Sequence, residues 1–364
     1  MSNIPHFHGS DIEEIEKYYG IPKEDLVGFG ANVNPLSLSP NVHSQLADRL
    51  DIITTYPDRN YVSLRDAIGN YCKADREHIV VGNGSTELIS LLIQHIHPRK
   101  ALLLGPTYSE YERELALCGG EMIYYDLTPD NEFLVDLDDL LPKLDETIDL
   151  LILCNPNNPT STAISSETME QILLHCKKYN IFVMVDETYI EFAPDISEFT
   201  SVPLAKSHDN LMVIRGVSKF FAAPGLRLGY AITSNVEFMS LIHTHQNPWS
   251  LNSIGALAGE LMVQDKDYIE RTRELIHSER ERIFAALQEI PELHSFKPVA
   301  NFFLVRILKP GVTSFDLFDY LVRQKLMIRD CSSFTNLKGE YIRFCIMLPE
   351  DNTRLLNGLK TYFS

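Results

Sequence analysis

The chain has 364 residues, of which 45% are hydrophobic and 23% charged, a composition that argues against disorder as its main state. The net charge is −18, and a charge of that sign repels nucleic acid and anionic membranes. Any anionic ligand would therefore need a local basic pocket. No apolar run reaches the roughly 18 residues of a membrane span, and the N-terminus lacks a signal-peptide pattern. We expect a cytoplasmic protein that binds neither nucleic acid nor a membrane.

The cysteines and histidines do not show the spacing of a metal site. The six cysteines form no C-x-x-C pair, and the 12 histidines include no H-E-x-x-H motif. We therefore expect reduced thiols, no disulfide framework and no bound metal.

From about residue 76 to 232, short apolar runs alternate with amphipathic stretches. The runs cover 78–82, 101–105, 121–126, 149–155, 181–187, 211–216 and 229–233. This alternation predicts a mostly parallel sheet with helices on both faces, in which ligands bind at the carboxyl ends of the strands. A charged helical region follows at about 253–290, and a shorter αβ segment ends the chain. We predict an α/β fold with a large domain at 46–250, a smaller C-terminal domain at 251–364, and an N-terminal arm at 1–45 that packs on the small domain.

The first polar turn follows the run at 78–82, in the segment VVGNGSTELI. Glu87 stands where a dinucleotide-binding fingerprint needs its third glycine, so that motif is excluded. Ser85, Thr86 and the free N–H groups at a helix N-terminus could hold one phosphate here. The alternative is a purely structural turn in which one of these residues caps the helix.

A second segment, SKFFAAPGLRLGY at 218–230, indicates covalent chemistry. Lys219 follows Ser218, and Arg227 is spaced so that its guanidinium can return to the same pocket. Arginine binds phosphate bidentately, and a lysine near that charge in a partly desolvated site has a lowered pKa, which favours imine formation. An isolated lysine after a strand is otherwise a solvated surface residue. A lysine that forms an imine beside a phosphate anchor is what pyridoxal phosphate requires.

Asp186 lies near the end of the run at 181–187. It is a candidate for the carboxylate that pyridoxal phosphate needs beside its ring nitrogen. Judged alone, it could belong to a structural ion pair; beside a pyridoxal ring, it would keep the ring nitrogen protonated. Tyr189 and Asn158 are candidate donors to the ring's phenolic oxygen, and Tyr108 is a candidate for stacking on the ring.

Together these motifs resemble the fold-type I pyridoxal-phosphate enzymes of the class I and II aminotransferase family. The similarity runs from YPDRNYVSLRDAI at Tyr56 through NPNNPT, VDETYIEF and SKFFAAPGLRLGY to Arg343. It implies an enzyme whose cofactor is pyridoxal 5'-phosphate, with Lys219 as the imine-forming lysine and Asp186 as the partner of the pyridine nitrogen. The catalytic set would be Lys219, Asp186 and Tyr108. The implied phosphate cradle comprises Ser85, Thr86, Ser218 and Arg227.

The same resemblance implies a homodimer with shared active sites. Tyr56 matches a tyrosine that reaches the phosphate of the neighbouring subunit's cofactor, and the N-terminal arm would also pack against that subunit. Arg343 matches the arginine that binds the substrate carboxylate.

Two subfamilies are candidates, the histidinol-phosphate aminotransferases and the threonine-phosphate decarboxylases. The decarboxylases resemble the chain more closely, through His8-Gly9, FGANVNPLS, QNPWSLN at 246–252 and MIRDCSSF followed by YIRF. Arg329 is then a second anion ligand, and Asn32 and His8 are weaker candidates for the substrate site. His8 could instead be an ordinary histidine at a frayed terminus.

The implied reaction is decarboxylation of O-phospho-L-threonine or O-phospho-L-serine to an amino-alcohol phosphate, for the cobalamin nucleotide loop. One alternative is an aminotransferase on a phosphorylated amino acid such as histidinol phosphate. A second alternative is a protein that binds pyridoxal phosphate without turnover. Arg329 and Arg343 argue against the second alternative, because the cofactor does not need them.

Three positions depart from the family pattern. Ser10 stands where the family commonly has the second glycine of HGG, and Ser161 follows NPNNPT where the family has glycine. Gly216 stands two positions before Ser218, where a hydroxyl residue is common. The loss of that hydroxyl removes one expected hydrogen bond to the phosphate.

Overall fold

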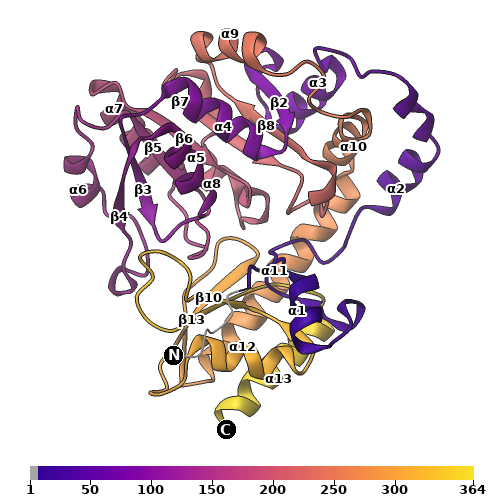
Figure 1. Cartoon of the computed structure of the whole chain (residues 1–364), viewed down its shortest axis with the longest axis vertical. Helices are drawn as coiled ribbons and strands as arrows, with labels where there is room; N and C mark the ends of the chain where they lie inside the picture. The colour runs from indigo at the N-terminus through magenta and orange to yellow at the C-terminus, as the bar shows by residue number, and fades with distance from the viewer. Residues whose placement is uncertain (1–6) are drawn as a thin grey trace.

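The computed structural model describes residues 7–364, apart from the side chain of His243, so the first six residues of the predicted arm lie outside the described part. Figure 1 shows an upper body around one sheet and a lower body around another. All seven predicted strands are present in the upper sheet, and the predicted fold class is confirmed. They are β2 (Ile79–Asn83), β3 (Lys100–Gly105), β4 (Glu121–Asp126), β5 (Leu150–Cys154), β6 (Phe182–Asp186), β7 (Leu211–Gly216) and β8 (Leu228–Ile232).

The upper sheet has the strand order β2-β8-β7-β6-β5-β3-β4. Only β8 runs antiparallel, to both of its neighbours. Alternate side chains of a strand enter different cores: Leu150 and Ile152 pack on one face, and Leu151 and Leu153 on the other. Because both faces are covered by helices, the strands read as continuous apolar runs in the sequence.

Six helices cover the two faces of the upper sheet. One face carries α4 (Ser85–Ile96), α5 (Glu110–Cys118) and α9 (Val236–His245). The other carries α3 (Val62–Cys72), α7 (Ser166–Lys178) and α10 (Ser253–Gln264). Short elements between them are α2 (Pro40–Ala47), α6 (Leu137–Leu140), α8 (Ile196–Phe199), and the 3-10 turns η2 (Leu50–Thr54) and η6 (Ile190–Phe192).

The lower body is built on an antiparallel sheet in the order β12-β13-β10-β9. Its strands are β9 (Leu293–Ser295), β10 (Phe302–Ile307), β12 (Arg329–Asp330) and β13 (Tyr341–Cys345), and its helices include α12 (Ser314–Val322) and α13 (Pro349–Phe363). The N-terminal segment contains α1 (Ile12–Tyr19) and β1 (Val27–Gly28), and β1 pairs in parallel with β11 (Leu326–Met327) of the lower body. The start of the chain is therefore hydrogen-bonded to a strand near its end.

The helical region predicted at 253–290 consists of two helices, α10 and α11 (Lys266–Gln288), which meet at Asp265. The Asp265 carboxylate caps α11 by accepting a hydrogen bond from the backbone N of Tyr268 at 3.2 Å, and it also accepts one from Ser39 Oγ at 2.5 Å. α10 packs against α3 in the upper body, whereas α11 runs toward the lower body (Figure 1). The exact domain boundaries stay a prediction.

Within residues 7–364, no helix is both long enough and apolar enough to cross a bilayer.

Candidate active site

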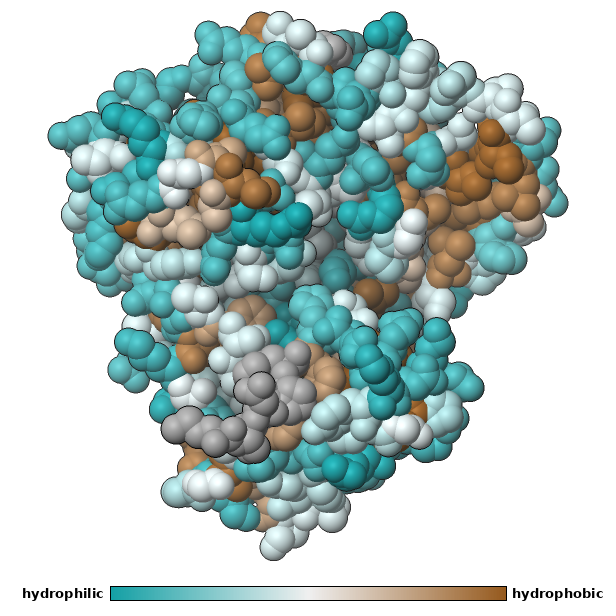
Figure 2. All heavy atoms as spheres, viewed as in Figure 1, coloured by the Kyte–Doolittle hydropathy of each residue, from teal (hydrophilic) through white to brown (hydrophobic). Residues whose placement is uncertain are grey.

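A cavity lies where the two bodies and the N-terminal segment meet, and Figure 2 shows the surface hollowed between the bodies. The upper body contributes polar residues at the carboxyl ends of its strands, as expected for a parallel sheet. The lower body contributes Arg329, Ser333, Phe334, Thr335 and Arg343, and the N-terminal segment contributes His8, Ser10, Gly30 and Ala31. The predicted residues that line the cavity are Ser85, Thr86, Tyr108, Asn158, Asp186, Tyr189, Ser218, Lys219, Arg227, Arg329, Arg343 and His8.

One end of the cavity is formed by the N-terminus of α4 and by Arg227. Gly84, which precedes α4, has a φ of 81°, and a Cβ there would lie 2.5 Å from Nη2 of Arg227. A Cβ at Gly229 would lie 2.3 Å from the backbone N of Ser85. The two glycines thus allow the guanidinium and the neighbouring strand to approach the first turn of the helix, where unpaired N–H groups favour an anion.

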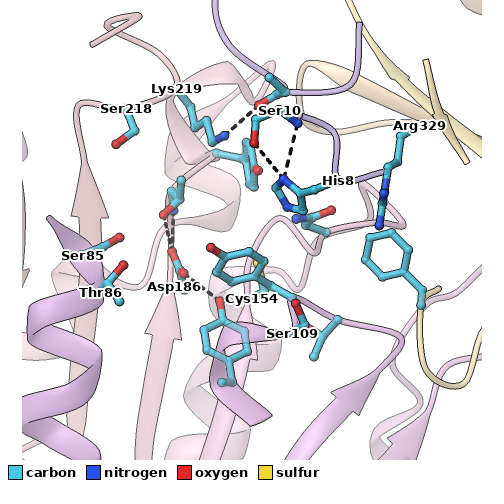
Figure 3. Close-up of a pocket in the computed structure, with 18 of the residues that line it drawn as sticks. His8, Ser10, Ser85, Thr86, Ser109, Cys154, Asp186, Ser218, Lys219 and Arg329 are labelled. Carbon is cyan, nitrogen blue, oxygen red and sulfur yellow. Dashed lines mark hydrogen bonds between the residues drawn. The ribbon is translucent and has the colours of Figure 1, made fainter. Parts of the chain in front are cut away.

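Three hydroxyl groups complete this end. Ser85, Thr86 and Ser218 all line the cavity, and none of their hydroxyls has a hydrogen-bond partner among the described residues. Figure 3 shows Ser85 and Thr86 on one side of the cavity and Arg329 on the opposite side, with Asp186 between them. The cavity therefore has two separate ends that carry positive charge.

Lys219 lies in the same cavity, and its Nζ donates a hydrogen bond to the carbonyl oxygen of Ala31 at 2.7 Å. Burial, and then the nearby positive charge of Arg343, lower the pKa of Lys219 to about 8. Roughly a tenth of this amine is therefore unprotonated at pH 7, far more than for an ordinary lysine, and the unprotonated amine is the form that attacks a carbonyl carbon.

Asp186 is buried at the end of β6 and is held by donors only. It accepts hydrogen bonds from the Tyr111 hydroxyl at 2.7 Å, from the backbone N of Thr188 at 2.9 Å and from Thr188 Oγ1 at 2.5 Å. These contacts fix the position of the carboxyl group at the end of β6, where it could pair with a pyridine nitrogen.

Sequence reasoning missed both partners of Asp186. The spacing of Asp186 and Thr188 is a signal that was available, because an aspartate often hydrogen-bonds the residue two positions later. Tyr111 lies three residues after Tyr108, in the first turn of α5, but 75 residues separate it from Asp186, so only the fold brings Tyr111 and Asp186 together.

Three further predicted residues surround the centre of the cavity. Tyr108 meets Tyr111 edge-on, with ring centroids 5.6 Å apart. Tyr189 packs edge-on against Phe302 at 5.0 Å. Asn158 accepts a hydrogen bond through Oδ1 from Nη1 of Arg343, so its amide NH₂ group is the part left to donate.

Arg329 and Arg343 occupy the other end of the cavity. They face each other in register across β12 and β13. Nη2 of Arg343 donates to the Gly30 carbonyl at 2.7 Å, and Nη2 of Arg329 donates to Ser333 Oγ at 2.7 Å. Both guanidinium groups lie over the Phe334 ring, 5.7 and 5.9 Å from its centroid.

This pairing of like charges would be stabilised by a bound anion. Burial, and also the charge of Arg343, lower the pKa of Arg329. Nε of Arg343 is buried without a hydrogen-bond partner among the described residues. Two adjacent cations with spare donors are suited to bind a phosphate or a carboxylate.

Two predicted residues do not line this cavity. Asn32 is buried behind Tyr189, with its Nδ2 3.5 Å from the tyrosine hydroxyl. Tyr56 is 79% exposed and packs against Trp249 with tilted rings whose centroids are 4.9 Å apart. The structure therefore does not bring Tyr56 to the cavity of its own chain.

The structure accommodates two of the departures from the family pattern. Ser161 has a φ of 62°, a conformation that favours glycine, and its buried Oγ accepts a hydrogen bond from the backbone N of Ala300 at 3.0 Å. The serine thereby links the upper body to the segment before β10. A Cβ at Gly216 would lie 3.3 Å from the Leu228 carbonyl oxygen, so a side chain there would be tightly confined.

The sequence profile of the class I and II aminotransferases matches residues 24–359. The chain belongs to this family. It is 35% identical to threonine-phosphate decarboxylase of Salmonella typhimurium over 97% of this chain and 95% of the relative. It is 31% identical to the adenosylcobalamin biosynthesis bifunctional protein CobDQ of Leptospira interrogans, over 99% of this chain and 41% of that longer protein. The crystal structure of histidinol-phosphate aminotransferase from Clostridium acetobutylicum has a TM-score of 0.85 and 33% identity, and the match covers 92% of this chain and 98% of that one.

Class I and II aminotransferases depend on pyridoxal phosphate, and the residues of this chain fit that cofactor. The glycines beside α4 leave room for a phosphate at the helix N-terminus, and three hydroxyls without partners face it. Lys219 provides an amine of lowered pKa, and Asp186 a carboxyl group fixed by hydrogen bonds from Tyr111 and Thr188. Among residues 7–364, no group of three or more His, Cys, Asp or Glu side chains is arranged to hold a metal ion.

Proposed function

We propose that this class I and II aminotransferase homologue is a pyridoxal-phosphate-dependent decarboxylase. Its substrate would be O-phospho-L-threonine or O-phospho-L-serine, and its products carbon dioxide and an amino-alcohol phosphate. Because two of its relatives are named for threonine phosphate and for adenosylcobalamin biosynthesis, we place this product in the cobalamin nucleotide loop.

The observation that carries the proposal is the second basic end of the cavity. Ser85, Thr86 and Arg227 form an anion site suited to the cofactor phosphate, which leaves Arg329 and Arg343 for the substrate. A simple amino acid offers one carboxylate, and one arginine suffices to bind it. Two in-register arginines and His8 at the rim suit a substrate that also carries a phosphate.

The residues of the chain would divide the work as follows. Lys219 holds the cofactor and, as an ammonium group, returns a proton to the carbon that loses carbon dioxide. Asp186, fixed by Tyr111 and Thr188, keeps the pyridine nitrogen protonated. Tyr108 stacks on the ring, and Asn158 and Tyr189 donate to its phenolic oxygen. Bound pyridoxal phosphate would supply an electron sink for the bond that is broken at the substrate Cα.

The binding of the substrate phosphate would decide which bond at Cα breaks. If Arg329 took the largest share of the binding energy through that phosphate, the phosphate rather than the carboxylate would fix how the substrate lies against the bound cofactor. Loss of the carboxylate would then replace removal of the Cα proton.

The second candidate is an aminotransferase acting on a phosphorylated amino acid such as histidinol phosphate. It is favoured by the likeness to the histidinol-phosphate aminotransferase of known structure, at 33% identity. The same two anion sites would then hold a phosphate at a different distance from Cα.

The two candidates differ in their products and their need for an acceptor. The purified holoenzyme is incubated with O-phospho-L-threonine and with O-phospho-L-serine, with and without 2-oxoglutarate, while carbon dioxide and glutamate are measured. We expect carbon dioxide at the same rate with and without the acceptor. Glutamate formation that requires 2-oxoglutarate and occurs without carbon dioxide would establish the aminotransferase instead.

We further propose that the protein is a homodimer with shared active sites. Leu50, Ile53, Tyr56 and Trp249 form an exposed apolar surface, which we call the Tyr56 patch. Figure 2 shows hydrophobic side chains at the right edge of the molecule, over the segment that follows α2 in Figure 1. An exposed patch of this kind is typical of a protein interface, and a second copy covering it would let Tyr56 approach the partner's cofactor.

We assign the protein to the cytoplasm. All six cysteines are free thiols, and four of them are buried in the core. Reduced cysteines of this kind are typical of the reducing cytoplasm rather than of secreted proteins.

A further inference from the structure

Ser10, which stands where the family commonly has glycine, contacts the ring of His8. Its Oγ lies 2.8 Å from Nδ1 of His8, and its backbone N donates to the same nitrogen at 3.4 Å. Figure 3 shows both contacts as dashed lines, with the His8 ring lying between Ser10 and Arg329. Both residues line the cavity, so this contact belongs to the basic end of the site.

The turn that carries His8 is held firmly in place. Asp11 accepts a hydrogen bond from the backbone N of His8 at 2.6 Å and donates its own N–H to the His8 carbonyl at 3.1 Å. A Cβ at Gly9 would lie 2.1 Å from the carbonyl oxygen of Gly30, so the backbone of this turn presses directly on that of Gly30. The same carbonyl accepts from Arg343, which ties the turn to the arginine pair.

This geometry selects one tautomer of His8. A backbone N–H can only donate, so the Ser10 N–H favours Nδ1 as the acceptor and the proton of the neutral ring on Nε2, but at 3.4 Å this contact is weak. The Ser10 hydroxyl, at 2.8 Å, can donate to the same nitrogen and is the stronger of the two contacts, so the choice of tautomer depends mainly on the hydroxyl. Nε2 is left as a donor toward a ligand in the cavity.

The charges around His8 keep its ring neutral in the free protein. Partial burial lowers the pKa of His8, and the positive charges of Arg329, Arg343 and Lys219 lower it further. Asp11 acts in the opposite direction and offsets only part of this effect. At neutral pH the tautomer, rather than the charge, therefore decides what the ring offers a ligand.

We propose that Ser10 is a positioning residue that holds His8 as an Nε2–H donor aimed at the phosphate of the substrate beside Arg329. The inference rests on the proposed function in so far as it takes the ligand to be a phosphomonoester. The sequence predicted only that His8 contacts the substrate. Ser10, the residue that departs from the family pattern, orients His8 in this proposal.

The test measures phosphate binding, which does not require turnover. The affinity of the pyridoxal-phosphate-loaded protein for inorganic phosphate is measured by calorimetry for Ser10→Ala, Ser10→Thr, His8→Ala and the double variant of His8→Ala with Ser10→Ala. Ser10→Ala removes the hydrogen bond between the Ser10 hydroxyl and the neutral His8 ring. Loss of one such bond costs enough free energy to lower the affinity for phosphate roughly three- to tenfold, and we expect a decrease of that size. Ser10→Thr keeps the hydroxyl and should stay within about twofold of the wild type.

The double variant distinguishes an indirect role from a direct one. If Ser10 acts through His8, Ser10→Ala should have no further effect once His8 is alanine. An equal loss in both backgrounds would mean that the Ser10 hydroxyl contacts the phosphate itself, and no loss in Ser10→Ala would mean that it has no role; either result overturns the proposal. The cofactor absorption band of each variant reports that the site is folded and loaded.

A second measurement reads the tautomer directly. In protein labelled with ¹⁵N-histidine, the His8 signals are assigned by their absence in His8→Ala. We expect the Nδ1 shift of an unprotonated ring nitrogen in the wild type and a shift toward mixed tautomers in Ser10→Ala. A protonated Nδ1 in the neutral wild-type ring would contradict the proposal. Failure of the decarboxylase function alone would look different, because phosphate binding and its dependence on His8 and Ser10 would persist without carbon dioxide release.

Discussion

At the scale of single residues, the electrostatics of Lys219 give a pH dependence for cofactor binding. Its pKa is lowered to about 8 by burial and then by Arg343, and only the unprotonated amine attacks a carbonyl. The rate at which the apoprotein takes up pyridoxal phosphate should therefore rise with pH and level off above about 8. In Arg343→Gln the midpoint should move to higher pH, because one cause of the lowering is removed.

Stopped-flow absorbance of the apoprotein mixed with pyridoxal phosphate measures this profile. Arg306→Gln is the matched control, since Arg306 lies on the same small sheet but makes its cation–π contact with Tyr341. An identical midpoint in the wild type and in Arg343→Gln would show that Arg343 does not influence the amine.

The two ends of the cavity should respond differently to loss of an arginine. Arg227→Ala removes the guanidinium beside Gly84 and should weaken retention of the cofactor. Arg343→Ala should leave the cofactor bound and lower kcat/KM for O-phosphothreonine. Loss of one partner from a close charge pair costs about 2 to 5 kcal/mol, so each effect should exceed roughly tenfold. Cofactor retention is measured by dialysis and absorbance, and equal cofactor loss in both variants would mean that the two sites have been confused.

The sequence predicted individual residues where the chemistry of the cofactor demands a specific type. Lys219, Asp186 and Arg227 were predictable because an imine, a protonated pyridine and a bound phosphate each require one kind of side chain. Their supporting contacts were not predictable, because Tyr111 reaches Asp186 and Arg343 reaches Asn158 only through the fold. The roles of the predicted residues stay predictions, although the structure gathers all of them except Asn32 and Tyr56 around one cavity.

At the scale of elements, the central strands were predictable because all but the edge strand β4, which is only partly buried, are buried on both faces. Their apolar runs are interrupted only where a turn begins. The division between α10 and α11 was not predictable, since the charged residues around Asp265 also suit the exposed face of one continuous helix. Tertiary contact with Ser39 and the cap on Tyr268 decide the break.

The 3-10 turn η6 buries a carboxyl group that should make stability depend on pH. Both oxygens of Glu191 are buried without a hydrogen-bond partner among the described residues, and burial raises the pKa of Glu191 to about 7. The native protein thus keeps this proton at pH values where the unfolded chain has lost it. The stabilising effect of the neutral form is fully present below the ordinary pKa of a glutamate and is lost as pH rises through about 7.

Glu191→Gln replaces the carboxyl by a neutral group of the same size and should remove this dependence. We expect the variant and the wild type to have similar urea midpoints near pH 5, and the variant to be more resistant near pH 8. Glu198→Gln is the control, because Glu198 is exposed on the nearby α8. If wild-type stability relative to Glu191→Gln did not fall between these pH values, Glu191 would be ionised in the native protein.

At the scale of the whole molecule, the position of Tyr56 is the one that the proposed homodimer requires. Its side chain is 79% exposed in the Tyr56 patch and does not line the cavity of its own chain. A residue that serves a cofactor from there must serve the cofactor of another chain. Neither fact could come from the sequence, which predicted the residue from the resemblance alone.

Mixing two inactive variants tests this sharing. Tyr56→Phe lacks the shared tyrosine and Lys219→Ala lacks the lysine, so each homodimer should be severely impaired. In a mixed dimer, one site receives Lys219 from one chain and Tyr56 from the other, and the remaining site lacks both. Random exchange of equal amounts makes half of the dimers mixed, so about a quarter of all sites should regain native residues and activity.

The exchange must be shown to occur and must depend on the Tyr56 patch. Native mass spectrometry of chains carrying different tags measures the mixed dimer directly. Ile53→Glu places a charge in the patch and should reduce dimer formation and recovery together, whereas Leu174→Glu, on the exposed surface of α7, should reduce neither. Figure 1 places α7 at the opposite side of the upper body from the segment that follows α2, so the control tests the same substitution on a distant surface. Verified mixed dimers without any recovered activity would mean that each chain completes its own site, and the exposed Tyr56 would then have no part in catalysis.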